Sequence, residues 1–166
     1  MSRIVHPIAP LWCAESRFLI LGSFPSVKSR ESEFFYGHPQ NRFWRVLASV
    51  FDQNTPQTIE EKTAFLLHNH IALWDVIGSC EISGSSDSSI KNVTVNDISC
   101  ILKAADIRQI YVNGKTAEKF YHRYLRNRIG RDAICLPSTS PANASFGLDR
   151  LVDAWKRIRL DNFDVK

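Results

Sequence analysis

The sequence predicts an α/β protein in which a central four-stranded parallel sheet is flanked by helices, giving a three-layer sandwich. Two observations support this prediction: four short apolar runs typical of buried strands, and amphipathic helical patterns between them. Strands that alternate with helices form βαβ units, and right-handed crossovers place the helices on both faces of the sheet. The length of 166 residues fits a single domain over residues 1–166.

The four strand candidates are short runs with few polar residues. Runs that are nearly continuous in apolar residues are typical of strands covered on both faces, because a strand with one wet face alternates. In chain order the runs are Arg17–Gly22, Ile71–Val76, Ile107–Val112 and Ala133–Leu136.

Five apolar stripes have helical spacing. The clearest runs from Phe43 to Phe51, with apolar residues at offsets 0, 3, 4, 7 and 8, which lie on one face of a helix. A weaker stripe follows at residues 59–67, and Asn96 is the candidate cap of the next. The remaining stripes cover residues 98–102, 117–125 and 148–158.

The composition is that of an ordinary globular protein, with 44% hydrophobic and 23% charged residues. A total of 21 Lys and Arg against 17 Asp and Glu gives a net charge of +4, which permits a polyanionic partner without requiring one. No apolar run approaches the roughly 20 residues that span a bilayer. Pro7 and Pro10 interrupt the N-terminal segment, so we expect no secretory signal, no membrane partner and a cytoplasmic protein.

The cysteines give no sign of a metal site. They stand at positions 13, 80, 100 and 135, and no two of them form a C-x-x-C pair. We therefore expect reduced, mostly buried thiols, as in a cytosolic protein.

One segment is compositionally biased: Ser83–Ser89 contains five serines with one Gly and one Asp. The sequence favours a mobile, solvated surface loop. A loop that touches a phosphate backbone is the alternative.

The strand ends carry the functional signal, because ligands of parallel sheets bind beyond the carboxyl ends of the strands. Gly, Pro, Ser, Asn or Asp follow every strand candidate, and such residues let backbone N–H groups approach an anion. Aromatic residues after the first strand can stack on a planar ring. A basic protein with such residues at the carboxyl edge of its sheet is expected to bind a nucleotide or a nucleic-acid base.

Asn41 has two readings that the local sequence leaves equally open. It stands just before the stripe that begins at Phe43, where Asn is a good helix N-cap. It also stands where a cleft would lie, so it is equally a candidate catalytic residue.

Five segments together resemble the uracil-DNA glycosylase superfamily, and above all its hypoxanthine (deoxyinosine) glycosylase branch. The resemblance covers nearly the whole chain, and its second and last motifs are the most specific. In order the motifs are Leu19-Ile-Leu-Gly-Ser-Phe-Pro-Ser26, Tyr36-Gly-His-Pro-Gln-Asn-Arg-Phe-Trp44, Ala72-Leu-Trp-Asp-Val76, Asn113-Gly-Lys115 and Leu136-Pro-Ser-Thr-Ser-Pro-Ala142.

The resemblance implies hydrolysis of the N-glycosidic bond of a deaminated base in DNA, without metal or organic cofactor. Mismatch-specific relatives carry a water-positioning Asn where this chain has Phe24, and the hypoxanthine branch uses the Asn that corresponds to Asn41. Hypoxanthine is therefore the expected base. The alternatives are removal of uracil or thymine from mismatches with G, and a non-catalytic binder of damaged DNA.

The remaining site residues follow from the resemblance and from the strand ends, each with a structural alternative such as a cap, turn or surface charge. The partner is expected to be DNA with a deaminated base, and the protein is expected to be a monomer. Arg42 and Lys28 are further candidate phosphate contacts, and Phe146 is a candidate wedge into the base stack. The base-binding candidates are Ser23, Phe24, Tyr36, His38, Asp75 and Asn113, and the DNA-binding candidates are Ser26, Lys115, Ser138, Thr139, Ser140, Ala142 and Asn143.

Overall fold

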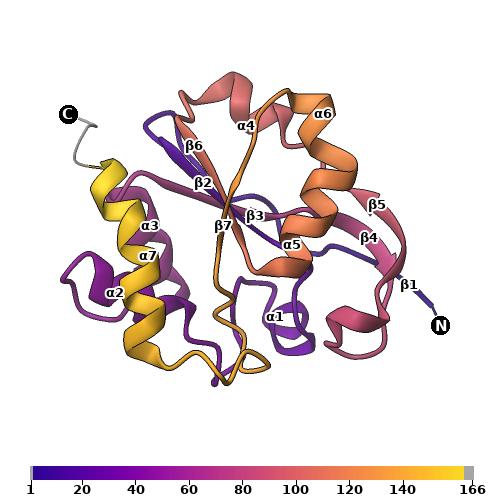
Figure 1. Ribbon diagram of the computed structural model, residues 1–166, viewed down its shortest axis with the longest axis horizontal. Coiled ribbons are helices and arrows are strands. Elements are labelled where there is room, and N and C mark those ends of the chain that lie inside the picture. Colours follow the sequence, from indigo (N-terminus) through magenta and orange to yellow (C-terminus); the bar gives the residue numbers. More distant parts are fainter. Residues whose placement is uncertain (1, 163–166) are drawn as a thin grey trace.

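The computed structural model describes residues 2–162 and contains the predicted parallel sheet (Figure 1). Its strands pair in the order β3-β2-β6-β7, and every pairing is parallel. Each strand lies within two residues of its predicted range, so the predicted fold class is confirmed. The strands are β2 (Phe18–Gly22), β3 (Ile71–Asp75), β6 (Gln109–Asn113) and β7 (Ile134–Leu136).

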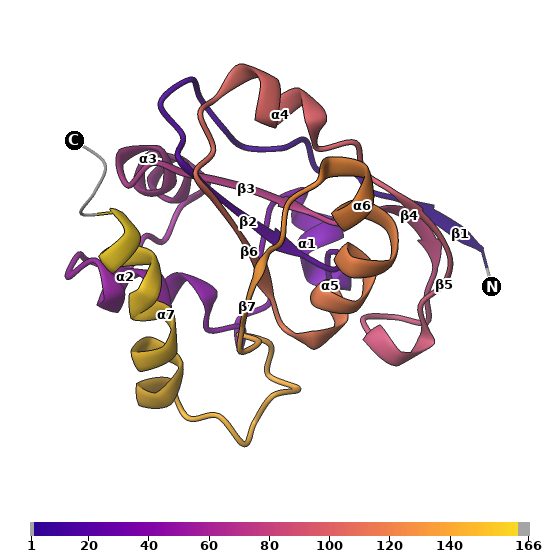
Figure 2. The same ribbon diagram turned by 45° about the horizontal axis from the view of Figure 1, so that its top comes forward.

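Two hydrophobic clusters cover the two faces of this sheet. Phe18 and Ile20 of β2 belong to the cluster that includes Leu47 and Trp155, whereas Leu19 and Leu21 belong to the cluster on the opposite face. This alternation is why an almost purely apolar strand is needed. Figures 1 and 2 show one layer of helices at each side, α2 (Phe43–Val50), α3 (Ile59–His68) and α7 (Leu148–Asn162) against α4 (Ser99–Ala104), α5 (Lys115–Phe120) and α6 (Arg126–Ile129).

All five predicted helical stripes are helical, but one cap was predicted wrongly. The stripe at 117–125 continues from α5 into a π-helical turn, η2 (Tyr121–Leu125). Helix α4 begins at Ser99, whose N–H donates to the side chain of Asp97. Asn96 instead donates through Nδ2 to the backbone oxygens of Asp75 and Ile77, because it joins the two sheets.

A second, antiparallel sheet was not predicted. It has the order β1-β4-β5, and β4 starts only one residue after β3 ends, so Val76 is the point where the chain passes between sheets. Helix α1 and the short helix η1 were also not predicted. The new elements are β1 (Arg3–Val5), β4 (Ile77–Glu81), β5 (Lys91–Val95), α1 (Val27–Ser32) and η1 (Asp87–Ser89).

The register brings the carboxyl ends of the parallel strands level with one another. Gly22 pairs with Asp75, and Asn113 pairs with Leu136. Loops that are distant in sequence therefore converge at one edge of the sheet.

None of the described helices is long and apolar enough to cross a membrane. All four cysteines are unpaired, as expected. Only Cys80 is fully buried, whereas Cys100 is exposed, so the expectation of mostly buried thiols was too broad.

Candidate functional site

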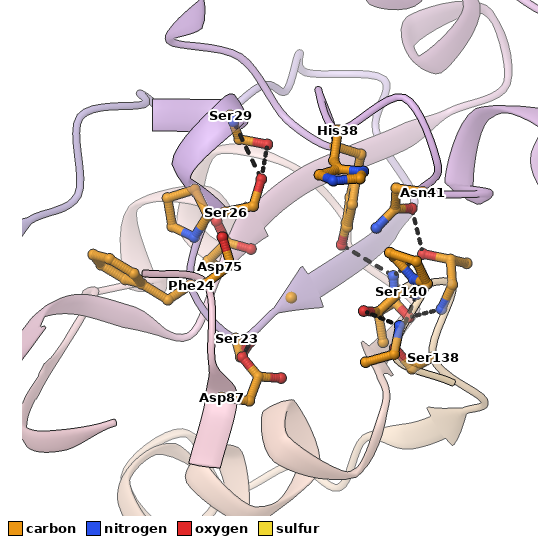
Figure 3. A pocket seen from close by; sticks show the side chains of 18 of the residues that line it. Ser23, Phe24, Ser26, Ser29, His38, Asn41, Asp75, Asp87, Ser138 and Ser140 are labelled. Atoms are coloured by element: carbon orange, nitrogen blue, oxygen red, sulfur yellow. Dashed lines mark hydrogen bonds between the residues drawn. The ribbon is translucent and has the colours of Figure 1, made fainter. Parts of the chain in front are cut away.

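A pocket of about 520 Å³ lies where the parallel strands end (Figure 3). This volume is within the range of about 300–1,000 Å³ typical of small-molecule sites. Among the predicted catalytic, base-binding and DNA-binding residues, Lys115 and Asn143 do not line the pocket, and neither do the further candidates Lys28, Arg42 and Phe146. Those that line it are Ser23, Phe24, Ser26, Tyr36, His38, Asn41, Asp75, Asn113, Ser138, Thr139, Ser140 and Ala142.

Asn41 lines the pocket and contacts the first residue of α2, but the N-cap position of that helix is Arg42, so Asn41 is not its N-cap. Its Oδ1 accepts hydrogen bonds from the backbone N–H of Phe43 and from the hydroxyl of Thr139, each at 2.9 Å. The Phe43 N–H can only donate, which identifies the accepting atom as oxygen. Both lone pairs of Oδ1 are thus used, and Nδ2 is the part of the amide left for the pocket (Figure 3).

Asn113 and Thr139 hold two loops together rather than presenting free polar groups. Nδ2 of Asn113 donates to the hydroxyls of Tyr36, at 3.1 Å, and Thr139, at 3.0 Å, and its Oδ1 accepts from the N–H of Thr139. Thr139 is completely buried. The predicted DNA contact of Thr139 is therefore not available in this arrangement, and Asn113 has no amide hydrogen left to read a base.

Tyr36 is held in an unusual backbone conformation with its ring against the core. Its φ of 50° lies in the left-handed region, which side-chain-bearing residues rarely adopt. The ring stacks on Phe43 with centroids 4.0 Å apart and planes 16° from parallel. Burial, and next the charge of Asp75, raise the pKa of the Tyr36 hydroxyl, so it keeps its proton at neutral pH. Only one face of this ring is free to meet a ligand.

Asp75 lies at the carboxyl end of β3 and is paired with His6, which was not predicted. Oδ2 of Asp75 lies 2.7 Å from Nε2 of His6, and the two side chains are 6% and 3% exposed. The partners are 69 residues apart in the chain. No sequence pattern links residues at that separation.

The segment after β2 is fixed by short side-chain contacts. The hydroxyl of Ser26 accepts from the N–H of Ser29 and so caps α1. The hydroxyl of Ser23 donates to Asp87 at 3.3 Å. Phe24 is 8% exposed, and the guanidinium of Arg30 lies 5.7 Å from its ring centroid. Phe24 therefore belongs to the pocket wall as an apolar residue.

The Ser83–Ser89 loop is exposed over residues 83–88, as predicted for a solvated surface loop, and it also borders the pocket. Residues 85–88 line the cavity. Ser85 accepts from the N–H of Val27, and the Gly84 carbonyl accepts from Arg30 at 2.6 Å. Burial is the main cause that raises the pKa of the Asp87 carboxyl. Asp87 adds a second carboxylate beside Asp75, and the serine-rich composition gave no hint of it.

His38 and the segment 138–143 have the local turn contacts that were their structural alternatives. Nδ1 of His38 accepts from the N–H of Gln40. The hydroxyls of Ser138 and Ser140 accept from the backbone N–H two residues later, and Asn143 donates to the carbonyl of Ser138. The serine hydroxyl hydrogens are still able to donate to a phosphate.

The candidate phosphate-binding cations differ in their surroundings. Arg42 donates to the carbonyl oxygens of Ser140, Asn143 and Phe146, so the predicted phosphate contact is replaced by a structural one. Lys115 is 91% exposed and 3.9 Å from Glu118.

Lys28 is exposed and lies 3.9 Å from Glu31. Phe146, the candidate wedge, is half-buried beneath the guanidinium of Arg150, 4.1 Å from its ring centroid. Neither of them lines the pocket.

Within residues 2–162, no group of three or more His, Cys, Asp or Glu side chains is arranged to hold a metal ion. The pocket itself supplies an amide donor, an aromatic face, two carboxylates and several hydroxyls.

Known proteins resemble this chain in sequence and in fold. Residues 9–159 match the family model of the uracil DNA glycosylase superfamily. A hypoxanthine DNA glycosylase of Methanosarcina acetivorans is 37% identical over 137 residues, which cover 81% of this chain and 85% of that protein. A hypoxanthine DNA glycosylase of Methanosarcina barkeri is 34% identical over the same shares.

A solved structure has the same fold. It is the solution NMR structure of a Methanosarcina acetivorans protein whose name likens it to a uracil DNA glycosylase. The TM-score is 0.77 at 30% sequence identity, and the match covers 94% of this chain and 99% of the other.

Proposed function

Because the chain belongs to the uracil DNA glycosylase superfamily, we propose that it is a DNA glycosylase that excises hypoxanthine from deoxyinosine in base excision repair. Two relatives that cover most of the chain carry the name hypoxanthine DNA glycosylase. The single observation that carries the proposal is Asn41, which lines the strand-end pocket with its oxygen fixed and its NH₂ group free.

The substrate base reaches the pocket by flipping out of the duplex, which costs a few kcal/mol. Hypoxanthine pairs less well than the adenine from which it forms, so its extrusion costs less. Inside the pocket, the base stacks on the face of Tyr36 that Phe43 leaves free.

The reaction is a hydrolysis at the anomeric carbon. The C1′–N9 bond breaks, with its electron pair passing to the base, and a bond forms between C1′ and the oxygen of water. The proton of the water ends on the departing base or on solvent. Positive charge develops on the sugar and negative charge on the base, as in other glycosidic transition states. Positioning and electrostatics therefore carry most of the barrier reduction.

In this proposal Asn41 places the water through Nδ2. The sequence-based hypothesis gave this task to the amide oxygen, but both lone pairs of Oδ1 are already used by Phe43 and Thr139. The Nδ2 group can donate to the water oxygen and hold it beside C1′. An amide takes no proton at neutral pH, so its role is positional.

The remaining expectations belong to the same proposal. Ser26, Ser138, Ser140 and Lys115 contact DNA phosphates, with hydroxyl or ammonium hydrogens as donors. The chain works as one domain over residues 1–166, as a cytoplasmic monomer, without metal or organic cofactor. Four unpaired cysteines are typical of a reducing compartment.

The decisive experiment is base release from matched duplexes that carry a single hypoxanthine or a single uracil. It is run on the wild type, Asn41→Asp and Asn41→Ala. Aspartate keeps an acceptor for Phe43 and Thr139 but lacks the NH₂ group. Alanine also loses the two hydrogen bonds that Oδ1 accepts, which costs about 1–3 kcal/mol of stability.

We expect wild-type release of hypoxanthine, and a loss of at least about 10²-fold in both variants, as for removal of a transition-state donor. DNA affinity stays within a few-fold of the wild type. Release of uracil alone would overturn the choice of substrate. Wild-type rates in Asn41→Asp would show that Asn41 has only a structural role, and no release from either duplex would leave a non-catalytic binder.

A further inference from the structure

The most informative group outside the proposed catalytic step is the buried pair of Asp75 and His6. Asp75 lines the pocket, and its Oδ2 accepts from His6 at 2.7 Å. Among the described residues, none donates a hydrogen bond to Oδ1 of Asp75. A carboxylate oxygen that lies in the wall of a pocket of suitable volume and has no protein donor can accept a hydrogen bond from a ligand.

His6 fixes which oxygen faces the pocket. The N–H of Ile8 donates to Nδ1 of His6 at 3.1 Å, so Nδ1 carries a lone pair and the ring proton is on Nε2. That proton points at Oδ2 of Asp75. The neutral imidazole therefore occupies one carboxylate oxygen and leaves the other for the pocket.

Aromatic rings hold the imidazole in place. Phe24, Phe35 and Trp74 surround it, with centroids 5.8, 6.5 and 6.3 Å from that of His6. Gly22 provides the space, because a Cβ there would lie against Oδ1 of Asp75. Each neighbour of the carboxylate thus constrains its position.

We propose that the His6–Asp75 pair reads the ring N–H that deamination creates on a base, with Asp75 as the acceptor and His6 as its positioning residue. This inference rests on the proposed function and names the atom that the site recognises. Adenine has a lone pair on N1 and an amino group on C6, whereas hypoxanthine has a hydrogen on N1 and a carbonyl on C6.

The discrimination between hypoxanthine and adenine depends on whether N1 of the base is a hydrogen-bond donor or an acceptor. A carboxylate oxygen facing N1–H of hypoxanthine gains a charge-assisted hydrogen bond. The same oxygen facing N1 of adenine meets a second lone pair and receives no hydrogen bond from the base. A site built to hydrogen-bond a substrate group rejects an analogue without that group by a large factor, about 10⁴–10⁵ in favourable cases. Guanine has the same N1–H, so the pair separates hypoxanthine from adenine rather than from every purine.

The test uses binding as well as turnover. Duplexes carry the uncleavable 2′-fluoro analogue of either deoxyinosine or deoxyadenosine, and the affinity ratio of the two is measured alongside the rate of hypoxanthine release. The variants are Asp75→Asn, His6→Ala and His6→Gln. The amide of glutamine can donate to Asp75 in place of Nε2. His68→Ala, at an exposed position on α3, is the matched control.

We expect the wild type to prefer the inosine duplex by at least about 10²-fold. Asp75→Asn loses most of this preference, His6→Ala loses part of it, His6→Gln restores it, and His68→Ala leaves it unchanged. Thermal melting shows whether each variant folds. A general loss of structure would lower both affinities together, so the ratio separates reading from folding.

A wild-type ratio in His6→Ala and Asp75→Asn would overturn the inference. Should Asp75→Asn fail to fold, His6→Ala and His6→Gln decide alone. If the wild type releases no base but still prefers the inosine duplex, the proposed catalysis fails and the reading pair stands. If it releases hypoxanthine without such a preference in binding, the proposed catalysis stands and the reading pair fails.

Discussion

At the scale of single residues, the pocket depends on the absence of a side chain at Gly22. Gly22 ends β2, and a Cβ at this position would lie 2.8 Å from the hydroxyl of Tyr36 and closer still to Oδ1 of Asp75. Real Cβ atoms do not approach other heavy atoms so closely. Glycine here is therefore required by space rather than by backbone conformation.

Gly22→Ala is expected to fold and to lose at least about 10²-fold in hypoxanthine release, because shifts of about 1 Å in a catalytic group have effects of that size. Single-turnover kinetics measure the loss. Gly147→Ala is the matched control, since nothing lies within 4 Å of a Cβ at that position. An unaltered rate in Gly22→Ala would mean that Asp75 and Tyr36 move aside without consequence.

Most site residues were predictable because each follows a strand, but their partners were not. Local sequence predicted that Asn41 could cap a helix or serve the pocket. Nothing local indicated that Thr139 would occupy its oxygen, or that His6 would reach Asp75. These contacts join positions that only the completed sheet brings together.

At the scale of elements, the segment after β7 is tied down by one guanidinium. Arg42, just before α2, donates to three carbonyl oxygens of residues 140–146. Carbonyl groups in a loop otherwise need water or neighbouring backbone N–H groups. Arg42 thereby links the two most specific motifs of the sequence.

Arg42→Ala is expected to destabilise the protein by about 1–3 kcal/mol, the range for hydrogen bonds to a charged group. Limited proteolysis and amide hydrogen exchange should place the loosening at residues 138–146. Arg45→Ala, at an exposed site on α2, serves as control. A loss of DNA affinity with unchanged exchange would instead support the phosphate contact predicted from the sequence.

Element prediction succeeded where strands are buried on both faces and failed where they are not. The four parallel strands carry continuous apolar runs. Strands β1, β4 and β5 are short and mix apolar with polar residues, and the register of β4 with β5 is irregular. Such strands form because a neighbour pairs with them, and that pairing is tertiary information.

At the scale of the whole molecule, the cysteines differ in how far solvent reaches them. Cys80 is buried in the core that covers Leu19 and Leu21, and burial raises the pKa of its thiol. Cys135 has a raised pKa for the same reason, whereas Cys100 is exposed. The thiolate is the reactive form, so burial lowers the reactivity of a cysteine in two ways: it blocks access of the reagent and it raises the thiol pKa.

Labelling of the native protein with a thiol reagent at pH 8 should show one fast-reacting cysteine, Cys100, and slow reaction at Cys80. Peptide mass spectrometry identifies the modified position, and Cys100→Ser should abolish the fast phase. Unfolding in denaturant should equalise all four. Fast modification of Cys80 in native protein would reveal local opening of that core.

The pocket draws on residues from nearly the full span of the chain: His6 stands close to its start, and the indole of Trp155 in α7 donates to the carbonyl of Pro137 beside the last loop. During synthesis on the ribosome, the final helix emerges after every other contributor. A chain that stops before α7 therefore lacks the hydrogen bond that fixes Pro137 next to the pocket.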